Sequence, residues 1–141
     1  MNRFNVLLVE DSPTDQKLFS LALDKQPCTL HIVSDGVKAL QFMRKEAEFA
    51  GEPKPDLIVL DLNIPLKDGI EVLKEIKSEP ELKATPVVVF STSSNEKDIF
   101  KCYQNYANAF ITKPLDLDRY LEVVQKSVDY WATVVASPKA N

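Results

Sequence analysis

Short, uninterrupted apolar runs dominate the hydrophobic pattern of this chain. Four of them lie at residues 6–9, 57–60, 87–90 and 109–112, and a weaker fifth lies at 29–33. They do not alternate between polar and apolar residues, and three of them are rich in β-branched side chains. Continuous runs of this length are typical of strands that are buried on both faces, so the pattern predicts a mostly parallel sheet covered by helices.

Segments with helical spacing separate the apolar runs. After the first run, Ser12 is placed to cap a helix, Pro13 suits its first position, and Asp15 supplies the acid that the helix dipole favours there. The side chains expected to face the core from this helix are Leu18, Leu21 and Ala22.

Four further helices follow in the same way. They are predicted after Gly36, after Gly69, over residues 96–105 and over residues 117–134. The core-facing residues of the first two are Val37, Leu40 and Met43, then Val72, Leu73 and Ile76. Strand and helix thus alternate five times, which predicts a (βα)₅ doubly wound α/β fold.

Composition and charge narrow the class of protein. The 141 residues are 45% hydrophobic and 27% charged, as expected for one soluble globular domain. We expect this domain to span residues 4–135, with a flexible tail at 136–141 and no attached output domain. A net charge of −4 argues against a nucleic-acid partner. No apolar run approaches the ~20 residues that span a bilayer, and no signal-peptide layout is seen, so a cytoplasmic location is expected.

Polar residues follow four of the five predicted strands. Glu10 and Asp11 follow the first, Asp61 the third, Ser91 the fourth and Lys113 the fifth. Ligands of open α/β sheets bind beyond the carboxyl ends of the strands. Each residue alone has an ordinary interpretation as a helix cap or a solvated loop residue. Their occurrence together at this edge predicts a functional site.

The residue types at this site indicate phosphoryl chemistry. Three crowded carboxylates repel one another unless a cation lies among them, and an all-oxygen ligand set suits Mg²⁺ or Mn²⁺. The Lys113 ammonium and the Ser91 hydroxyl can bind phosphoryl oxygens. Asp61 can then serve as the nucleophile that attacks in line.

Five spaced motifs carry a family resemblance: LVEDS at 8–12, LDLNIP at 60–65, DG at 68–69, FST at 90–92 and ITKPL at 111–115. In this order they resemble the receiver domain of two-component response regulators, over residues 4 to about 130. The resemblance implies the strand order 2-1-3-4-5. That order places the first and third strands side by side and brings Asp11 and Asp61 together.

The resemblance also implies a role for each site residue. Asp61 is the expected phosphoacceptor. Mg²⁺ is expected to bind Asp61 and Asp11 directly, Glu10 through water, and the backbone carbonyl of Asn63. Lys113 is expected to bind a phosphoryl oxygen.

A switch and an unusual peptide bond follow from the same resemblance. Ser91 is expected to move toward the phosphoryl group, and Phe110 to swing inward behind it. A cis peptide bond is expected between Lys113 and Pro114. The chain departs from the usual family pattern in having Tyr106 where many relatives have glycine. Two smaller departures are Glu10 in place of aspartate and Ser91 in place of threonine.

The stretch DYWATVV at 129–135 is similar to the end of small stand-alone response regulators that serve cyanobacterial phytochrome kinases. This similarity implies a stand-alone regulator that accepts a phosphoryl group from a phytochrome-type histidine kinase. Such a protein is a phosphoacceptor with expected self-dephosphorylation, not an enzyme acting on a separate substrate. The simpler interpretation is an amphipathic final helix with Trp131 at its surface.

The last helix has more apolar residues than one sheet face needs. They are Leu121, Val124, Val128, Tyr130, Trp131, Val134 and Val135. Four of them, Leu121, Val124, Val128 and Trp131, repeat at steps of three and four residues, whereas Tyr120, Tyr130 and Val134 lie off that stripe. An apolar excess of this kind predicts a partner surface, and twofold dimers are the commonest solution. We therefore expect a homodimer through the fourth helix, fifth strand and fifth helix. If Trp131 instead packs onto its own domain, the protein is a monomer.

Three alternatives remain. A flavodoxin-like FMN-binding protein needs a hydroxyl- and glycine-rich phosphate loop after the first strand, where Glu10 and Asp11 would repel phosphate. A phosphatase of the haloacid dehalogenase type needs a second aspartate where Asn63 stands. A binding-only receiver that is never phosphorylated would not need the complete acceptor set.

Overall fold

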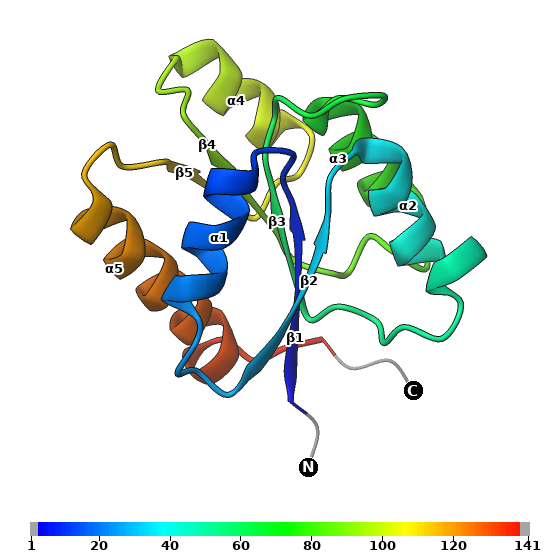
Figure 1. Ribbon diagram of the computed structural model, residues 1–141. Helices are drawn as coiled ribbons and strands as arrows, with labels where there is room; N and C mark the ends of the chain where they lie inside the picture. Colours follow the sequence, from blue (N-terminus) through cyan, green and yellow to red (C-terminus); the bar gives the residue numbers. More distant parts are fainter. Residues whose placement is uncertain (1–2, 139–141) are drawn as a thin grey trace.

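Five parallel strands form the centre of the molecule in the computed structural model, which describes residues 3–138 (Figure 1). They are β1 (Phe4–Val9), β2 (Cys28–Val33), β3 (Leu57–Leu60), β4 (Val87–Ser91) and β5 (Ala109–Thr112). Their order in the sheet is β2-β1-β3-β4-β5, and every neighbouring pair is parallel. The predicted (βα)₅ fold and strand order are confirmed.

Five α-helices cover the sheet. They are α1 (Pro13–Ala22), α2 (Gly36–Arg44), α3 (Gly69–Ser78), α4 (Glu96–Gln104) and α5 (Leu117–Asp129). A short 3₁₀ helix, η1 (Ala47–Phe49), follows α2, and a π-helical turn, η2 (Tyr130–Val134), continues α5. Helices α1 and α5 pack on one face of the sheet, and α2, α3 and α4 contribute to the core on the other face (Figure 1).

Alternate residues of each central strand supply the two cores. Leu7 and Val9 of β1 face α2 and α3, whereas Val6 and Leu8 face α1 and α5. All four are buried, which is why these strands are continuous apolar runs rather than alternating ones. The expected stripe of α3, which consists of Val72, Leu73 and Ile76, is fully buried.

The expected core stripe of α1 is partly wrong. Leu21 is 59% exposed, whereas Phe19 is 2% exposed and lies edge to face against Phe90 of β4. The large ring fills the space next to the sheet, so the helix presents Phe19 and Ala22 to the core and turns Leu21 to solvent. In α2, Leu40 and Met43 are buried as expected, but Val37 is exposed, and Ala39 and Phe42 of the same helix are buried instead.

The end of the chain also differs from expectation. The predicted helix over 117–134 is α-helical only to Asp129 and then widens into η2. Of the predicted tail at 136–141, residues 139–141 lie outside the described part of the chain. None of the helices described within residues 3–138 is both long and apolar enough to cross a bilayer.

The turn before β5 takes a left-handed conformation at Tyr106, with φ of 68°. This is the position at which the sequence departs from the usual glycine. The backbone thus keeps the conformation that glycine favours, with a tyrosine whose side chain projects into solvent.

Candidate functional site

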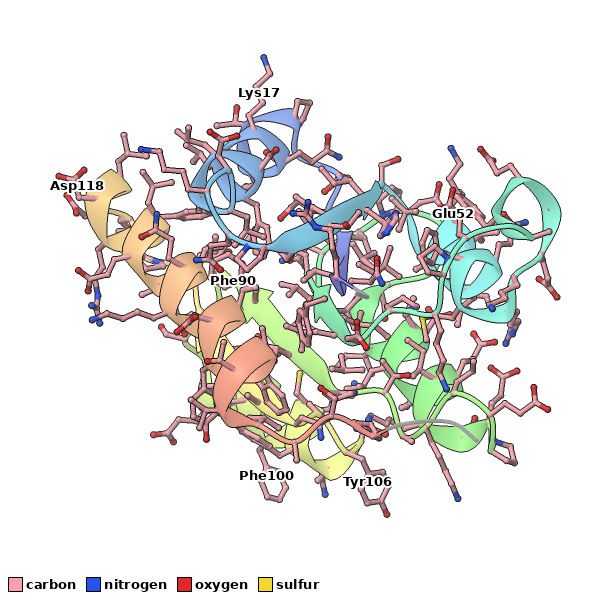
Figure 2. The ribbon with its side chains drawn as sticks, turned by 90° about the horizontal axis from the view of Figure 1, so that it is seen from below. Lys17, Glu52, Phe90, Phe100, Tyr106 and Asp118 are labelled. Atoms are coloured by element: carbon pink, nitrogen blue, oxygen red, sulfur yellow. The ribbon has the colours of Figure 1, made fainter. Side chains whose placement is uncertain are left out.

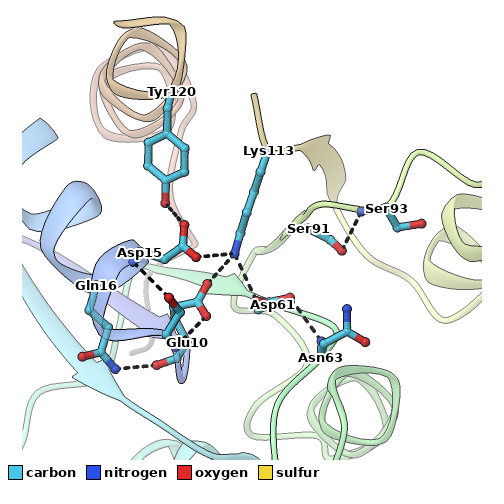
Figure 3. A network of polar contacts seen from close by, with 10 residues as sticks. Glu10, Asp15, Gln16, Asp61, Asn63, Ser91, Ser93, Lys113 and Tyr120 are labelled. Carbon is cyan, nitrogen blue, oxygen red and sulfur yellow. Dashed lines mark hydrogen bonds and ion pairs between the residues drawn. The ribbon is translucent and has the colours of Figure 1, made fainter. Parts of the chain in front are cut away.

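The carboxyl ends of the strands bring the predicted site residues together, as Figure 3 shows. Glu10, Asp61, Ser91 and Lys113 are all buried at this edge, and Asp11 is exposed beside them. They lie at the carboxyl ends of four strands, with Glu10 and Asp11 both following β1, so the parallel sheet itself aligns them. Residues more than 100 positions apart in the chain, such as Glu10 and Lys113, are thereby in contact.

Lys113 is the centre of this site. Its Nζ lies 2.5 Å from Glu10 Oε1 and 3.1 Å from Asp61 Oδ2, and it donates hydrogen bonds to both. A third carboxylate, Asp15, approaches with Oδ2 at 3.5 Å. The Lys113 backbone N–H donates to the Ser91 carbonyl at 2.6 Å, which fixes the start of the side chain.

Three carboxylates at this edge form a group suited to a divalent cation. Oxygen atoms of Glu10, Asp11 and Asp61 all lie within 4.8 Å of one another. The group contains neither histidine nor cysteine, and hard cations such as Mg²⁺ and Mn²⁺ prefer such all-oxygen ligands. Asn63 lies next to this group, and its backbone N–H donates to Asp61 Oδ1 at 3.1 Å. The residues present therefore fit a divalent metal.

Burial and charge set the electrostatics of the site. Burial raises the pKa of Glu10 to about 7, because the stabilising contacts from Lys113 and the Ser12 N–H do not fully offset desolvation. Burial alone would lower the pKa of Lys113, but the Glu10 hydrogen bond and the negative charge of Asp61 outweigh it and raise that pKa. Lys113 therefore remains a cation among the carboxylates.

The predicted switch residues lie on the neighbouring strands. Ser91 is fully buried, and its hydroxyl accepts a hydrogen bond from the Ser93 N–H at 3.2 Å. Phe110 is half-buried on β5, and its backbone N–H donates to the Tyr103 hydroxyl at 3.1 Å. The Ser91 side chain is thus turned to its own loop, one strand away from Phe110.

Two residues of the polar network were not recognised as site residues from the sequence. The sequence predicts Asp15 only as an acid that favours the start of α1, and it places Tyr120 off the apolar stripe of the last helix. Tyr120 is instead 4% exposed, and its hydroxyl donates to Asp15 Oδ1 at 3.0 Å. A signal was available for Asp15, because the first turn of α1 begins at the same sheet edge as the strand ends. None was available for Tyr120, whose role depends on the packing of α5 against α1.

The expected cis peptide bond is wrong: across residues 3–138 every peptide bond is trans, including Lys113–Pro114. The ammonium does not need a cis bond to reach the carboxylates. The backbone of Lys113 is anchored to Ser91, and its long side chain extends directly to Glu10 and Asp61.

Comparison with known proteins agrees with this geometry. The family described as "Response regulator receiver domain" matches residues 6–125. The response regulator Rcp1 of Synechocystis sp. is 42% identical over 137 residues, which cover 96% of this chain and 93% of Rcp1.

Two solved structures have the same fold. The phosphorylated cyanobacterial phytochrome response regulator RcpA superposes with a TM-score of 0.94 at 43% identity, covering 98% of this chain and all of RcpA. The Mn²⁺-bound form of Rcp1 superposes with a TM-score of 0.92 at 40% identity, again covering 98% of this chain and all of the other. With the family match across most of the chain and the acidic site at the expected strand ends, this protein belongs to the response regulator receiver domain family.

Proposed function

We propose that Asp61 accepts a phosphoryl group from the phosphohistidine of a histidine kinase. The supporting observation is the contact of 3.1 Å between Asp61 Oδ2 and the buried Lys113 ammonium, in a site with two further carboxylates. A carboxylate oxygen of Asp61 forms a bond to phosphorus, the phosphorus–nitrogen bond breaks, and the imidazole leaves and takes up a proton. Hydrolysis of the resulting acyl phosphate by water returns Asp61 and releases inorganic phosphate.

We propose that Mg²⁺ or Mn²⁺ is bound by Glu10, Asp11, Asp61 and the backbone carbonyl of Asn63. When bound, the cation supplies positive charge that stabilises the phosphoryl oxygens during transfer. Lys113 supplies the second positive charge and binds a phosphoryl oxygen. Burial of Lys113 strengthens this interaction, since the surrounding dielectric is low.

The acceptor is tested by incubating the protein with acetyl phosphate and Mg²⁺ and weighing it intact. We expect one phosphoryl adduct on the wild type and none on Asp61→Asn. The exposed Asp24→Asn is the matched control and should be labelled normally. An equal adduct on Asp61→Asn would move the acceptor elsewhere, and an unlabelled wild type would support a receiver that only binds partners.

The metal is tested in the same assay. Excess chelator and the Asp11→Ala substitution should each abolish labelling, because the crowded carboxylates then lack the divalent charge that offsets them. Undiminished labelling in chelator would contradict the proposed metal role.

Ser91 and Phe110 are proposed as the switch that reports phosphorylation. The Ser91 hydroxyl is held by the Ser93 N–H and would have to exchange this bond for a phosphoryl oxygen. That shift would release space for the half-buried Phe110 ring on the next strand. If Ser91→Ala is phosphorylated and binds its partner with unchanged phosphate dependence, the switch lies elsewhere.

A phytochrome-type histidine kinase is the proposed phosphoryl donor, acting in the cytoplasm. The support is the similarity to RcpA, whose description is that of a cyanobacterial phytochrome response regulator, over nearly the whole chain. A phosphotransfer screen should show faster transfer from phytochrome-type kinases than from unrelated histidine kinases. Equal rates from both groups would contradict this partnership.

A homodimer through α4, β5 and α5 is the final part of the proposal. In Figure 2, Phe100 and Tyr106 project from the same edge of the molecule, whereas Phe90 lies between the sheet and α5. Phe100 is 62% exposed and Tyr106 is 75% exposed. Of the apolar residues of α5 and η2 that predict this surface, Val124 and Val128 are buried and Trp131 is partly buried against the core of its own domain. The support for the dimer therefore comes from α4 and the turn after it, where exposed aromatic side chains favour a partner surface.

A further inference from the structure

A chain of polar contacts joins α5 to the Lys113 ammonium through α1 (Figure 3). The Tyr120 hydroxyl donates to Asp15 Oδ1 at 3.0 Å, and Asp15 Oδ2 lies 3.5 Å from Lys113 Nζ. The Tyr120 ring is fixed by Phe90, with the ring centroids 5.3 Å apart. Asp15 therefore has one oxygen for the tyrosine and one for the lysine.

The Tyr120 hydroxyl is fixed as a donor in this arrangement. Burial, followed by the neighbouring charge of Asp15, raises the pKa of Tyr120 far above its usual value. The phenol thus stays protonated, and its hydrogen bond holds the Asp15 carboxylate in one orientation.

Asp15 has no place in the proposed acceptor chemistry, unlike the other two carboxylates on Lys113. Glu10 is assigned to the metal, and Asp61 to the metal and the phosphoryl group. When those two are engaged, Asp15 remains as a negative charge that attracts the ammonium toward α1 and away from the phosphoryl oxygens. The Tyr120 hydrogen bond satisfies part of that negative charge and so weakens its attraction for Lys113.

We propose that Asp15 and Tyr120 are positioning residues that set how strongly Lys113 binds a phosphoryl group on Asp61. This inference rests on the proposed function, in which Asp61 is the phosphoacceptor. Asp15 competes for the ammonium, and Tyr120 moderates the competition. The two residues therefore have opposite effects, although they are hydrogen-bonded partners.

Opposite effects distinguish this role from a purely structural one. Asp15→Asn removes the competing charge and should tighten binding at Asp61 by about tenfold, the size of one charge-assisted interaction. Tyr120→Phe keeps the ring against Phe90 but removes the donor, so Asp15 should attract Lys113 more strongly and binding should weaken by roughly threefold to tenfold. In the double variant, the loss of the hydroxyl should have no further effect.

The experiment is a titration of the full chain with beryllofluoride in Mg²⁺, followed by fluorine NMR, for the wild type, both single variants and the double variant. Tyr130→Phe, which removes an exposed hydroxyl from η2, is the matched control and should bind as the wild type does. The half-life of the acyl phosphate is the second readout, and should lengthen in Asp15→Asn and shorten in Tyr120→Phe.

The outcomes separate this inference from the proposed function. If Tyr120→Phe weakens binding equally with and without Asp15→Asn, or if Asp15→Asn weakens it, the positioning role is overturned while the acceptor assignment stands. Circular dichroism melting of each variant, with Asp15→Ala as a second substitution, identifies any loss caused by unfolding. If wild type and Asp61→Asn behave alike in the titration, the proposed function itself is overturned, and this inference with it.

Discussion

At the scale of single residues, one ammonium lies within ion-pair distance of three carboxylates. Lys113 contacts Glu10, Asp61 and Asp15, and the first two of these are buried. Placing several charges in a low dielectric is costly unless they are paired, so the site is held together by the position of Lys113. A divalent cation joining this group changes the charge balance, and the raised pKa of Glu10 determines how that depends on pH.

Metal affinity should therefore depend on pH. Glu10 has a pKa of about 7 in the metal-free protein, above its usual 4.5, and a metal binds the ionised form. We expect Mg²⁺ affinity, measured by calorimetry, to fall as the pH is lowered through 7, by up to about tenfold per unit well below the pKa.

The stability of the metal-free protein should also depend on pH. Because folding raises the pKa of Glu10 from 4.5 to about 7, the free energy of unfolding should decrease as the pH rises from 4.5 to 7 and Glu10 ionises. Glu10→Gln should flatten both dependences; an affinity that is constant from pH 6 to 8 would contradict this assignment.

Gly36 lies so close to a neighbouring loop that a side chain at this position would collide with its backbone. A Cβ at this position would lie 2.1 Å from the carbonyl oxygen of Lys67, in the loop between β3 and α3. We expect Gly36→Ala to lower the free energy of unfolding in urea by about 1–3 kcal/mol, as overpacking against backbone does. Gly51→Ala is the control, because nothing lies within 4 Å of a Cβ there, and a loss of the same size in both variants would contradict the explanation.

At the scale of elements, α4 and β5 are connected at the edge of the sheet. β5 is an edge strand, and the Phe110 N–H is satisfied by the Tyr103 hydroxyl of α4 rather than by a neighbouring strand. This contact ties the backbone of the proposed switch residue to the helix next to it. A displacement of the Phe110 backbone would consequently displace Tyr103 at the surface of α4.

Loss of that contact should be visible by hydrogen exchange. Tyr103→Phe removes the hydroxyl that accepts from Phe110, so we expect faster exchange of the Phe110 amide, measured by NMR, with a gain of roughly tenfold. The Lys113 amide, which donates to the Ser91 carbonyl, is the internal control and should exchange at its wild-type rate. If the Phe110 amide exchanged at its wild-type rate in Tyr103→Phe, the Tyr103 hydroxyl would not be what protects it from exchange.

At the scale of the whole molecule, the hydrophobic cores on the two faces of the sheet differ in composition. The core under α2, α3 and α4 contains Cys102, whose pKa burial raises to about 11, so this thiol stays neutral and packs as an apolar side chain. The opposite core contains the aromatic series Phe19, Phe90 and Tyr120, which leads from α1 to α5 next to Lys113. Exposed aromatic residues lie outside both cores, on α4, the following turn and η2.

Those exposed aromatics should determine the oligomeric state. We expect the wild type to sediment as a dimer at tens of micromolar in beryllofluoride, and Phe100→Glu to sediment as a monomer because a charge cannot be buried in an apolar contact without cost. Leu21→Glu, at an exposed apolar position of α1, is the matched control and should remain dimeric. A monomeric wild type with and without beryllofluoride would rule the dimer out.

The sequence by itself determined the sheet and the position of the acidic site. Buried parallel strands must be apolar on both faces, so β1, β3 and β4 are visible as continuous runs. Since parallel strands end at one edge, the residues that follow them had to meet there, and Glu10, Asp61 and Lys113 do. The resemblance to receiver domains then implied the strand order, which alternation of strands and helices alone leaves open.

Tertiary structure decided what depends on packing between elements that are distant in the chain. The rotation of α1, which buries Phe19 and exposes Leu21, depends on how the Phe19 ring fits against Phe90. Tyr120 meets Asp15 only because α5 lies beside α1, 105 residues away along the chain. A local pattern records how polar each position is, but not which distant side chain fills the space beside it. That is why the sequence located Glu10, Asp61 and Lys113, whereas the contacts of Asp15 with Lys113 and Tyr120 became visible only in the folded molecule.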